Sequence, residues 1–221
     1  GRADGGGGAG EGGASVGAQE GVDTVEGEGA SAGRAAVLCR FAGGNLWSGR
    51  EQDRADAECQ FCDTDFVGTD GAGGGRFATA AELAEACRAT AGDAPGLIVL
   101  TGGEPMLQVD IALIEALHAA GFTIAIETNG TLPVPTAIDW ICVSPKAGTE
   151  IKQRSGQELK LVYPQAGLDP AALADWSFEH YFLQPMDGPD LAANTAQAVA
   201  YCKANPSWRL SVQTHKVLGI P

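Results

Sequence analysis

The sequence has no apolar run of 18 or more residues, the length that a membrane-spanning helix needs. It is also poor in basic side chains, with 14 Lys and Arg against 28 Asp and Glu, which gives a formal net charge of −14. Binding to nucleic-acid phosphates needs a basic face, so a nucleic-acid partner is not expected. The N-terminal residues lack the basic and then apolar pattern of a secretion signal. We therefore predict a cytoplasmic protein without a membrane partner.

Cysteine is scarce and unevenly spaced, which does not fit a disulfide framework. Cys87, Cys142 and Cys202 lie in apolar patterns and are predicted to be small buried side chains. Cys59 and Cys62 form a Cys-x-x-Cys pair, which places two thiols on one short turn. Such a pair can bind zinc or an iron–sulfur cluster, or act as a redox dithiol. No second pair of Cys or His completes a zinc site by its spacing.

Apolar side chains are few at the N-terminus, where 13 of the 32 glycines lie within residues 1–33. A segment of this composition cannot offset its ordering entropy, so we expect residues 1–19 to be disordered. The following residues, Gln19–Val25, make a poor strand because Gly21 and Asp23 interrupt it. A single folded domain is predicted over residues 20–221.

Strands and helices alternate through the rest of the chain. Apolar runs predict strands at 34–41, 97–101, 122–127, 138–143, 158–163, 181–184 and 209–213. Helical spacing predicts helices at 79–90, 109–120, 170–175 and 192–204, and residues 42–75 are left as a long loop. Alternating elements of this kind form right-handed βαβ units around a parallel sheet, so the fold class is α/β. Periodicity does not decide between an open and a closed sheet.

Four of these strands end in polar turns. The turns are Thr101-Gly-Gly-Glu-Pro105, Glu127-Thr-Asn-Gly130, Ser144-Pro-Lys146 and Gln184-Pro-Met-Asp187. Each can be read as an ordinary strand-to-helix turn. However, adjacent glycines also let a ligand approach the backbone closely, and the carboxyl ends of parallel strands are where barrel enzymes place their chemistry.

Taken in order, these motifs resemble those of the radical S-adenosylmethionine enzymes, and among them the 7-carboxy-7-deazaguanine synthases of the queuosine pathway. The resemblance runs from about residue 20 to Pro221. The matching segments are Glu26–Gly29, Arg40–Gly43, Cys59–Thr64, Thr101–Pro105, Glu127–Gly130, Ser144–Lys146, Gln184–Asp187 and Thr214–Lys216.

The resemblance implies a fold, a reaction and a set of cofactors. The fold is a partial (β/α) barrel. The reaction is a radical ring contraction of 6-carboxy-5,6,7,8-tetrahydropterin to 7-carboxy-7-deazaguanine, a lyase reaction that releases ammonia. The cofactors are a 4Fe–4S cluster, S-adenosylmethionine and Mg²⁺. A homodimer and an electron donor such as flavodoxin are implied as partners.

The same resemblance assigns roles to individual residues. Cys59 and Cys62 would hold the cluster, whose third ligand position falls on Gly44, and Thr64 would bind Mg²⁺. Substrate contacts would come from Val25, Glu26, Gly27, Arg40, Thr101 and Pro221. Cofactor contacts would come from Gly103, Glu104, Glu127, Asn129, Ser144, Pro145, Lys146, Gln184, Pro185, Met186 and Asp187.

Two positions depart from the family pattern. Glu26 stands where the family usually has Gln, and an ionised carboxylate only accepts hydrogen bonds. Gly44 stands where the family has its first cluster cysteine. Cys39 could substitute only if it faced the site, and strand alternation predicts that it points away. The alternatives are therefore a catalytically silent relative that only binds the pterin or a nucleoside, and a different radical enzyme such as a glycyl-radical activase.

Overall fold

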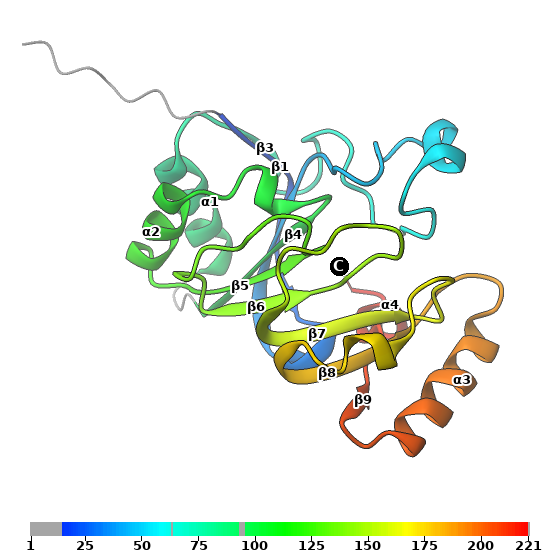
Figure 1. Ribbon diagram of the computed structural model, residues 1–221. Coiled ribbons are helices and arrows are strands. Elements are labelled where there is room, and N and C mark those ends of the chain that lie inside the picture. The colour runs from blue at the N-terminus through cyan, green and yellow to red at the C-terminus, as the bar shows by residue number, and fades with distance from the viewer. Residues whose placement is uncertain (1–14, 63, 93–95, 221) are drawn as a thin grey trace, which may run out of the picture.

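One curved sheet organises the molecule (Figure 1). The computed structural model describes residues 15–62, 64–92 and 96–220. The strands are β1 (Val16–Val25), β2 (Ala35–Phe41), β3 (Gly75–Phe77), β4 (Leu97–Gly102), β5 (Thr123–Thr128), β6 (Trp140–Val143), β7 (Ser155–Tyr163), β8 (Ser177–Pro185) and β9 (Trp208–Leu210). The α-helices are α1 (Ala80–Ala91), α2 (Ile111–Ala119), α3 (Leu191–Ala204) and α4 (Thr214–Leu218).

The sheet is mostly parallel and remains open. Its strand order is β3-β1-β2-β4-β5-β6-β7-β8-β9, and β2 is followed by parallel neighbours up to β9. Only β1 is antiparallel to its neighbours, at the β3 edge. No pairing joins β3 to β9 among the described residues, so the barrel is incomplete. The predicted α/β class and partial barrel are confirmed.

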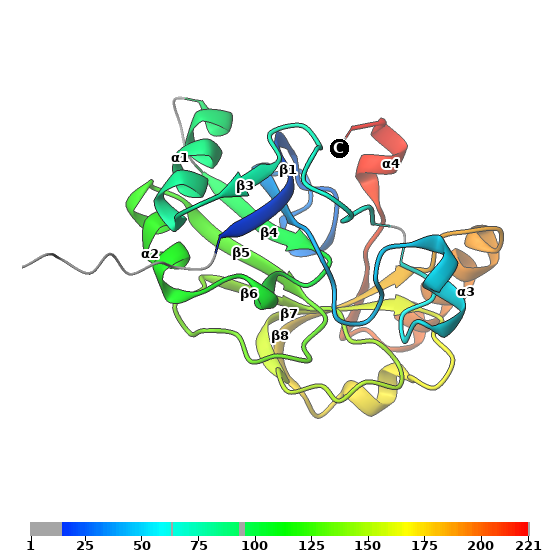
Figure 2. The same cartoon turned by 90° about the horizontal axis from the view of Figure 1, so that it is seen from above.

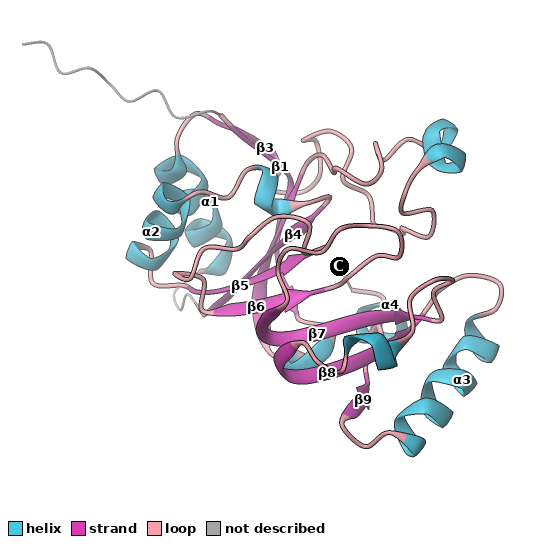
Figure 3. Cartoon of the chain, viewed as in Figure 1, coloured by secondary structure: helices cyan, strands magenta, loops and turns pink. Residues whose placement is uncertain are grey.

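Helices cover the outer face of this sheet (Figure 3). Helices α1 and α2 pack together beside β1, β2 and β5, and α3 packs against β8 and β9. Two of these helices begin at side-chain caps: Thr79 Oγ1 accepts a hydrogen bond from Glu82 N (3.2 Å), and Asp110 Oδ1 accepts one from Leu113 N (2.9 Å). Helix α1 therefore begins directly after its cap Thr79, the first residue of the helix predicted at 79–90.

Strand alternation sorts apolar and polar side chains onto opposite faces. Cys39, Leu100 and Ile126 are fully buried in the outer core under the helices. Their neighbours Arg40, Thr101 and Glu127 consequently face the inside of the partial barrel. Small residues and aliphatic side chains fill the inner face below them: Ala36, Leu97, Val99 and Ala125. The inner face of the sheet is thus apolar in its lower part and polar near the carboxyl ends of the strands.

The structure corrects several predicted boundaries. Strand β1 begins at Val16, inside the segment expected to be disordered, because it pairs with both β2 and β3; residues 1–14 lie outside the described part. The expected loop after β2 ends in strand β3 and contains a 3-10 helix at Glu51–Asp56. The helix predicted at 170–175 is a 3-10 turn at Pro170–Leu173, and β9 ends at Leu210, before α4.

The long segment between β2 and β3 extends beyond the carboxyl ends of the strands (Figures 1 and 2). Backbone hydrogen bonds hold it in place, including Gly43 N to Phe66 O (3.1 Å) and Glu58 N to Leu46 O (3.1 Å). The Cys-x-x-Cys turn lies on this segment. Over the described residues, no helix is long and apolar enough to cross a membrane.

Candidate active site

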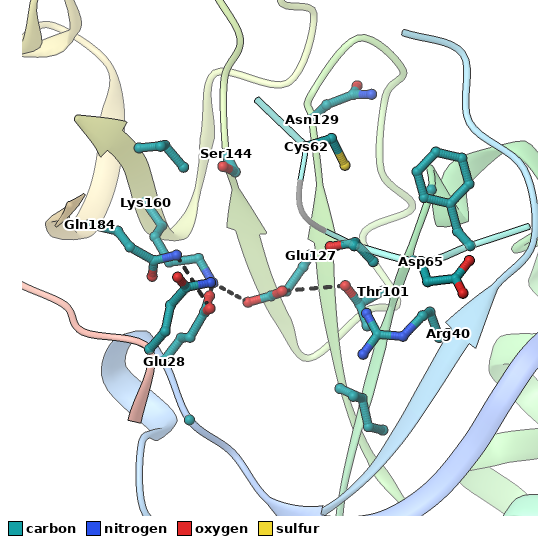
Figure 4. Close-up of a pocket in the computed structure, with 18 of the residues that line it drawn as sticks. Glu28, Arg40, Cys62, Asp65, Thr101, Glu127, Asn129, Ser144, Lys160 and Gln184 are labelled. Atoms are coloured by element: carbon teal, nitrogen blue, oxygen red, sulfur yellow. Dashed lines mark hydrogen bonds and ion pairs between the residues drawn. The ribbon is translucent and has the colours of Figure 1, made fainter. Parts of the chain in front are cut away.

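A cavity of about 450 Å³ opens at the carboxyl ends of the strands (Figure 4). It brings together most of the residues singled out in the sequence. Those in its wall are Val25, Glu26, Gly27, Arg40, Gly44, Cys59, Cys62, Thr64, Thr101, Gly103, Glu127, Asn129, Ser144, Lys146, Gln184, Pro185, Met186 and Asp187. The ends of separate strands thus converge on one pocket beside the paired sulfurs of Cys59 and Cys62.

Two predicted contacts lie behind the wall. Glu104 is fully buried, and its carboxylate accepts hydrogen bonds from Thr128 Oγ1 (2.7 Å), Asn129 N (2.9 Å) and Met106 N (3.0 Å). It therefore shapes the turns after β4 and β5 and has no exposed oxygen for a cofactor. Pro145 is also buried, and Pro221 lies outside the described residues.

Arg40 on β2 is held from behind by Glu20 on β1. Its Nε donates to Glu20 Oε1 at 2.7 Å, and the two side chains are about one-fifth exposed. This bond is the only one described for the guanidinium, so its two Nη groups face the cavity without a described protein acceptor (Figure 4). A guanidinium oriented this way can bind a ligand carboxylate with two parallel hydrogen bonds.

A row of polar side chains crosses the cavity from β4 to β8 (Figure 4). Thr101 Oγ1 donates to Glu127 Oε2 (3.3 Å), and Lys160 Nζ bonds Glu127 Oε1 (2.5 Å) and Glu28 Oε2. Gln184 Nε2 then donates to Glu28 Oε1 (3.3 Å). Strands β4, β5, β7 and β8, together with the turn after β1, thus present donors and acceptors that alternate across the cavity.

Carboxyl groups crowd the part of the cavity opposite Arg40. Burial and, to a smaller extent, the charge of Glu127 together raise the pKa of Glu26 to about 7, against the opposing effect of Lys160. Burial also raises the pKa of Glu158, whose Oε2 accepts a hydrogen bond from Ala30 N (3.2 Å). Burial would raise the pKa of Glu28, but the charge and hydrogen bond of Lys160, together with smaller effects of His215 and Gln213, outweigh burial and lower this pKa. This end of the cavity therefore offers mainly hydrogen-bond acceptors to a ligand.

Cys59 and Cys62 line the cavity next to Lys146. The hydrogen bond between the two thiols and burial raise the pKa of Cys59, while the nearby Lys146 opposes this shift. Lys146 Nζ donates to Ser144 O (2.7 Å) and Ser144 Oγ (2.8 Å), and burial lowers its pKa. Arg54 supports the turn by donating to the carbonyls of Gln60 (2.8 Å) and Cys62 (3.0 Å).

Comparison with known proteins agrees with this geometry. Residues 53–154 match the model of the radical SAM superfamily. The chain is 65% identical to the 7-carboxy-7-deazaguanine synthase of Bordetella pertussis and 64% identical to that of Caulobacter vibrioides, in each case over 90% of this chain and 95% of the relative. The chain belongs to the 7-carboxy-7-deazaguanine synthase family. The crystal structure of QueE from Escherichia coli matches with a TM-score of 0.70 and 26% identity, over 91% of this chain and 95% of that one.

Membership of this family implies S-adenosylmethionine and a 4Fe–4S cluster, but the residues present do not complete a cluster site. Within the described part of the chain, no three Cys, His, Asp or Glu side chains converge to hold a metal. Cys59, Cys62 and Gly44 line the same cavity, so two thiols are present and the third position is a glycine. Two thiolates leave a cluster short of one of its protein ligands.

Cys39 does not fill this gap. It is fully buried in the outer core, on the face of β2 opposite Arg40, and its thiol is hydrogen-bonded to that of Cys87 on α1. That bond and burial raise the pKa of Cys39 well above its usual range. The expectation from strand alternation, that Cys39 points away from the site, agrees with this placement.

Gly103 allows the turn after β4 to touch the backbone beside Gly44. Gly103 N donates to Phe41 O (3.2 Å), and Glu104 N donates to Gly43 O (3.0 Å). A Cβ on residue 103 would overlap the Gly43 carbonyl and lie 2.8 Å from Gly44 N. Both neighbours are backbone atoms, so the overlap cannot be relieved by moving a side chain.

We therefore expect Gly103→Ala to lower the free energy of unfolding by about 1–3 kcal/mol, the usual cost of forcing extra volume into a packed site. Urea unfolding followed by circular dichroism measures this change. Gly96→Ala is the matched control, because a Cβ there meets nothing within 4 Å. Equal stability of the Gly103 variant and the wild type would show that the turn moves freely relative to Gly43.

Several wall residues were given no role from the sequence: Glu20, Glu28, Lys160, Gln213 and His215. Of these, Glu28 and His215 lie in two of the matching segments, Glu26–Gly29 and Thr214–Lys216. A signal for Lys160 was available, since it alternates with Glu158 in an otherwise apolar strand. A charged side chain at such an inward position needs a buried partner. No comparable local signal marks Glu20, whose importance depends on its pairing with Arg40 across two strands.

Proposed function

We propose that the chain acts as a 7-carboxy-7-deazaguanine synthase. The reaction is the ring contraction of 6-carboxy-5,6,7,8-tetrahydropterin to 7-carboxy-7-deazaguanine, in which the only other product is ammonia, so no external oxidant is consumed overall. When bound, the cluster and S-adenosylmethionine supply the radical that starts this reaction. A homodimer, a flavodoxin-type electron donor and Mg²⁺ at Thr64 are part of the proposal.

The polarity of the cavity is the observation that carries this proposal. The guanidinium of Arg40, aligned by Glu20, lies at one side. In Figure 4 the carboxylate of Glu28 lies across the cavity and that of Glu127 lies between the two sides. The carboxyl of Glu26 also lines the cavity, and its Oε1 accepts a hydrogen bond from Glu28 N (3.0 Å). A ligand with a carboxylate at one end and an aminopyrimidinone edge, rich in N–H donors, at the other matches both sides. A 6-carboxypterin has this arrangement.

The remaining wall suits a larger polar cofactor beside the substrate. The turns after β4, β5, β6 and β8 supply the backbone of Gly103 and side chains of Asn129, Ser144 and Gln184. These groups line the same cavity as the thiols of the Cys-x-x-Cys turn. We assign S-adenosylmethionine to this part of the cavity. Thr64, also in the wall, provides the oxygen ligand that Mg²⁺ prefers.

A second candidate function is binding without radical chemistry, and Gly44 is the observation that favours it. The substrate and cofactor walls do not depend on the third thiol. A chain with an incomplete cluster site could therefore retain affinity for a pterin while turning over poorly.

The carboxylate clamp gives a direct test of the substrate assignment. We expect the protein without its cluster to bind 6-carboxypterin about tenfold or more tightly than pterin, which lacks the carboxylate. Arg40→Met should remove this preference, because the neutral side chain keeps the packing but not the two charge-assisted hydrogen bonds. Fluorescence titration with both compounds measures the two affinities.

The control for this titration is Arg76→Met, since Arg76 lies exposed on edge strand β3, outside the cavity wall. It should leave both affinities unchanged. If the wild type bound pterin and 6-carboxypterin equally, or neither of them, the assignment of Arg40 and of the substrate class would be wrong.

A further inference from the structure

Lys160 is the buried cation at the centre of the polar row. It lies on β7, is only 3% exposed, and its ammonium bonds both Glu28 Oε2 and Glu127 Oε1. Glu28 comes from the turn after β1, whereas Glu127 comes from the end of β5 (Figure 4). One side chain therefore joins the turn after β1 to the end of β5.

The ion pairs of Glu28 and Glu127 in the described part of the chain are both made with Lys160. The groups that face Lys160 from the surrounding elements are mostly acidic. They are Glu26 and Glu28 from the end of β1 and the turn after it, Glu127 from β5, Cys142 from β6 and Glu158 from β7, with Lys146 as a further cation and His215 of α4 near Glu28. One ammonium thus faces four carboxyl groups.

The charges within this cluster shift the pKa values of both Lys160 and Glu28. Burial alone would lower the pKa of Lys160, but the charges of Glu127 and Glu28 override burial and raise this pKa well above its usual range. In return, Lys160 lowers the pKa of Glu28 despite its burial. Removal of one partner from such a buried pair leaves an uncompensated charge, which usually takes up a proton.

We propose that Lys160 is a positioning residue that holds the carboxylates of Glu28 and Glu127 aimed into the cavity and keeps Glu28 ionised, so that both side chains accept hydrogen bonds from bound ligands. This inference rests on the proposed function, because it takes the aminopyrimidinone edge of the pterin as the donor for Glu28. Lys160 itself has both of its described ion-pair partners on the protein, and it acts on the ligand through them.

Lys160→Met tests this role, because Met has a similar length and no charge. Without the ammonium, the buried Glu28 should hold a proton at low pH and lose it at high pH. We expect the affinity for 6-carboxypterin to fall about tenfold or more at pH 6.5 and about threefold or less at pH 9. Titration of the cluster-free protein across this pH range measures the loss relative to the wild type.

Lys152→Met is the matched control, since Lys152 is exposed and outside the cavity wall. Circular dichroism and thermal unfolding establish that each variant folds. A loss of affinity that is the same at every pH, or no loss at all, would overturn the positioning role. Failure of the wild type to bind 6-carboxypterin would instead overturn the proposed function.

A double-mutant cycle keeps the test decisive if Lys160→Met is less stable. Glu28→Gln alone should weaken binding, but added to Lys160→Met it should cost little more at pH 6.5, because Glu28 is already neutral there. The double variant Lys160→Met/Glu28→Gln also lacks the uncompensated charge of Glu28. It should therefore have a higher free energy of unfolding than Lys160→Met alone. Additive losses in binding would show that Glu28 and Lys160 act independently, which contradicts the proposal.

Discussion

Gly44→Cys is expected to raise the iron bound after anaerobic reconstitution to about four atoms per chain, the content of one 4Fe–4S cluster. The wild type should retain far less, because Cys59 and Cys62 are the only thiols in the cavity wall among the residues that the structure describes. Formation of 7-carboxy-7-deazaguanine and cleavage of S-adenosylmethionine should rise with the iron. Iron and sulfide analysis, electron paramagnetic resonance and product chromatography measure these effects.

The loop has room for this cysteine. A Cβ on residue 44 would lie 3.1 Å from Trp47 O and 3.3 Å from Phe66 Cε2, so its neighbours need to move by only a few tenths of an ångström. Phe66 packs edge-on against Trp47, with ring centroids 5.6 Å apart. The backbone that flanks residue 44 is also tied to Phe66 and to the turn after β4. A cysteine at position 44 therefore fits after small shifts of Trp47 and Phe66.

Gly96→Cys separates a restored site from iron held by any additional thiol. Gly96 lies outside the cavity wall and has open space around a new side chain. It should leave the iron content at the wild-type level. A wild type that already held about four irons and turned over at the rate of the variant would contradict the expectation, and would mean that a group other than residue 44 completes the cluster.

The sequence was sufficient for the parallel part of the sheet and for the convergence of its strand ends. Continuous apolar runs that alternate with helices, such as Leu97–Thr101, are typical of parallel strands buried on both faces. Strand β4 forms at this run. The N-terminal strand could not be predicted in the same way. Gly21 and Asp23 lower its local propensity, but pairing with β2 on one side and β3 on the other compensates.

The functions of individual site residues depended on contacts that no local pattern contains. Glu104 looked like a ligand contact because it follows two glycines, yet three protein donors surround its carboxylate. Lys160 looked like part of a strand, yet it binds carboxylates that lie 132 and 33 residues away. Such pairings become visible only when the sheet register is known.

Glu26→Gln is expected to stabilise the protein at alkaline pH and not at acidic pH. The folded protein holds the pKa of Glu26 at about 7, against a usual value of 4.5. Between these two values the folded state binds a proton that the unfolded state has lost, so stability falls as the pH rises from about 4.5 to about 7 and is constant above. The burial of an ionised Glu26 then costs up to ~3 kcal/mol.

A glutamine at position 26 cannot ionise, and its amide can still accept the hydrogen bond that Glu28 N donates to Glu26 Oε1 (3.0 Å). Urea unfolding at pH 5 and pH 8 should therefore show near-equal stability of the two proteins at pH 5 and a gain for the variant at pH 8. Glu85→Gln, on the exposed face of α1, should change stability little at either pH. A gain of the same size at both values would mean that Glu26 is ionised throughout and that the carboxyl cluster around Lys160 is less crowded than its geometry indicates.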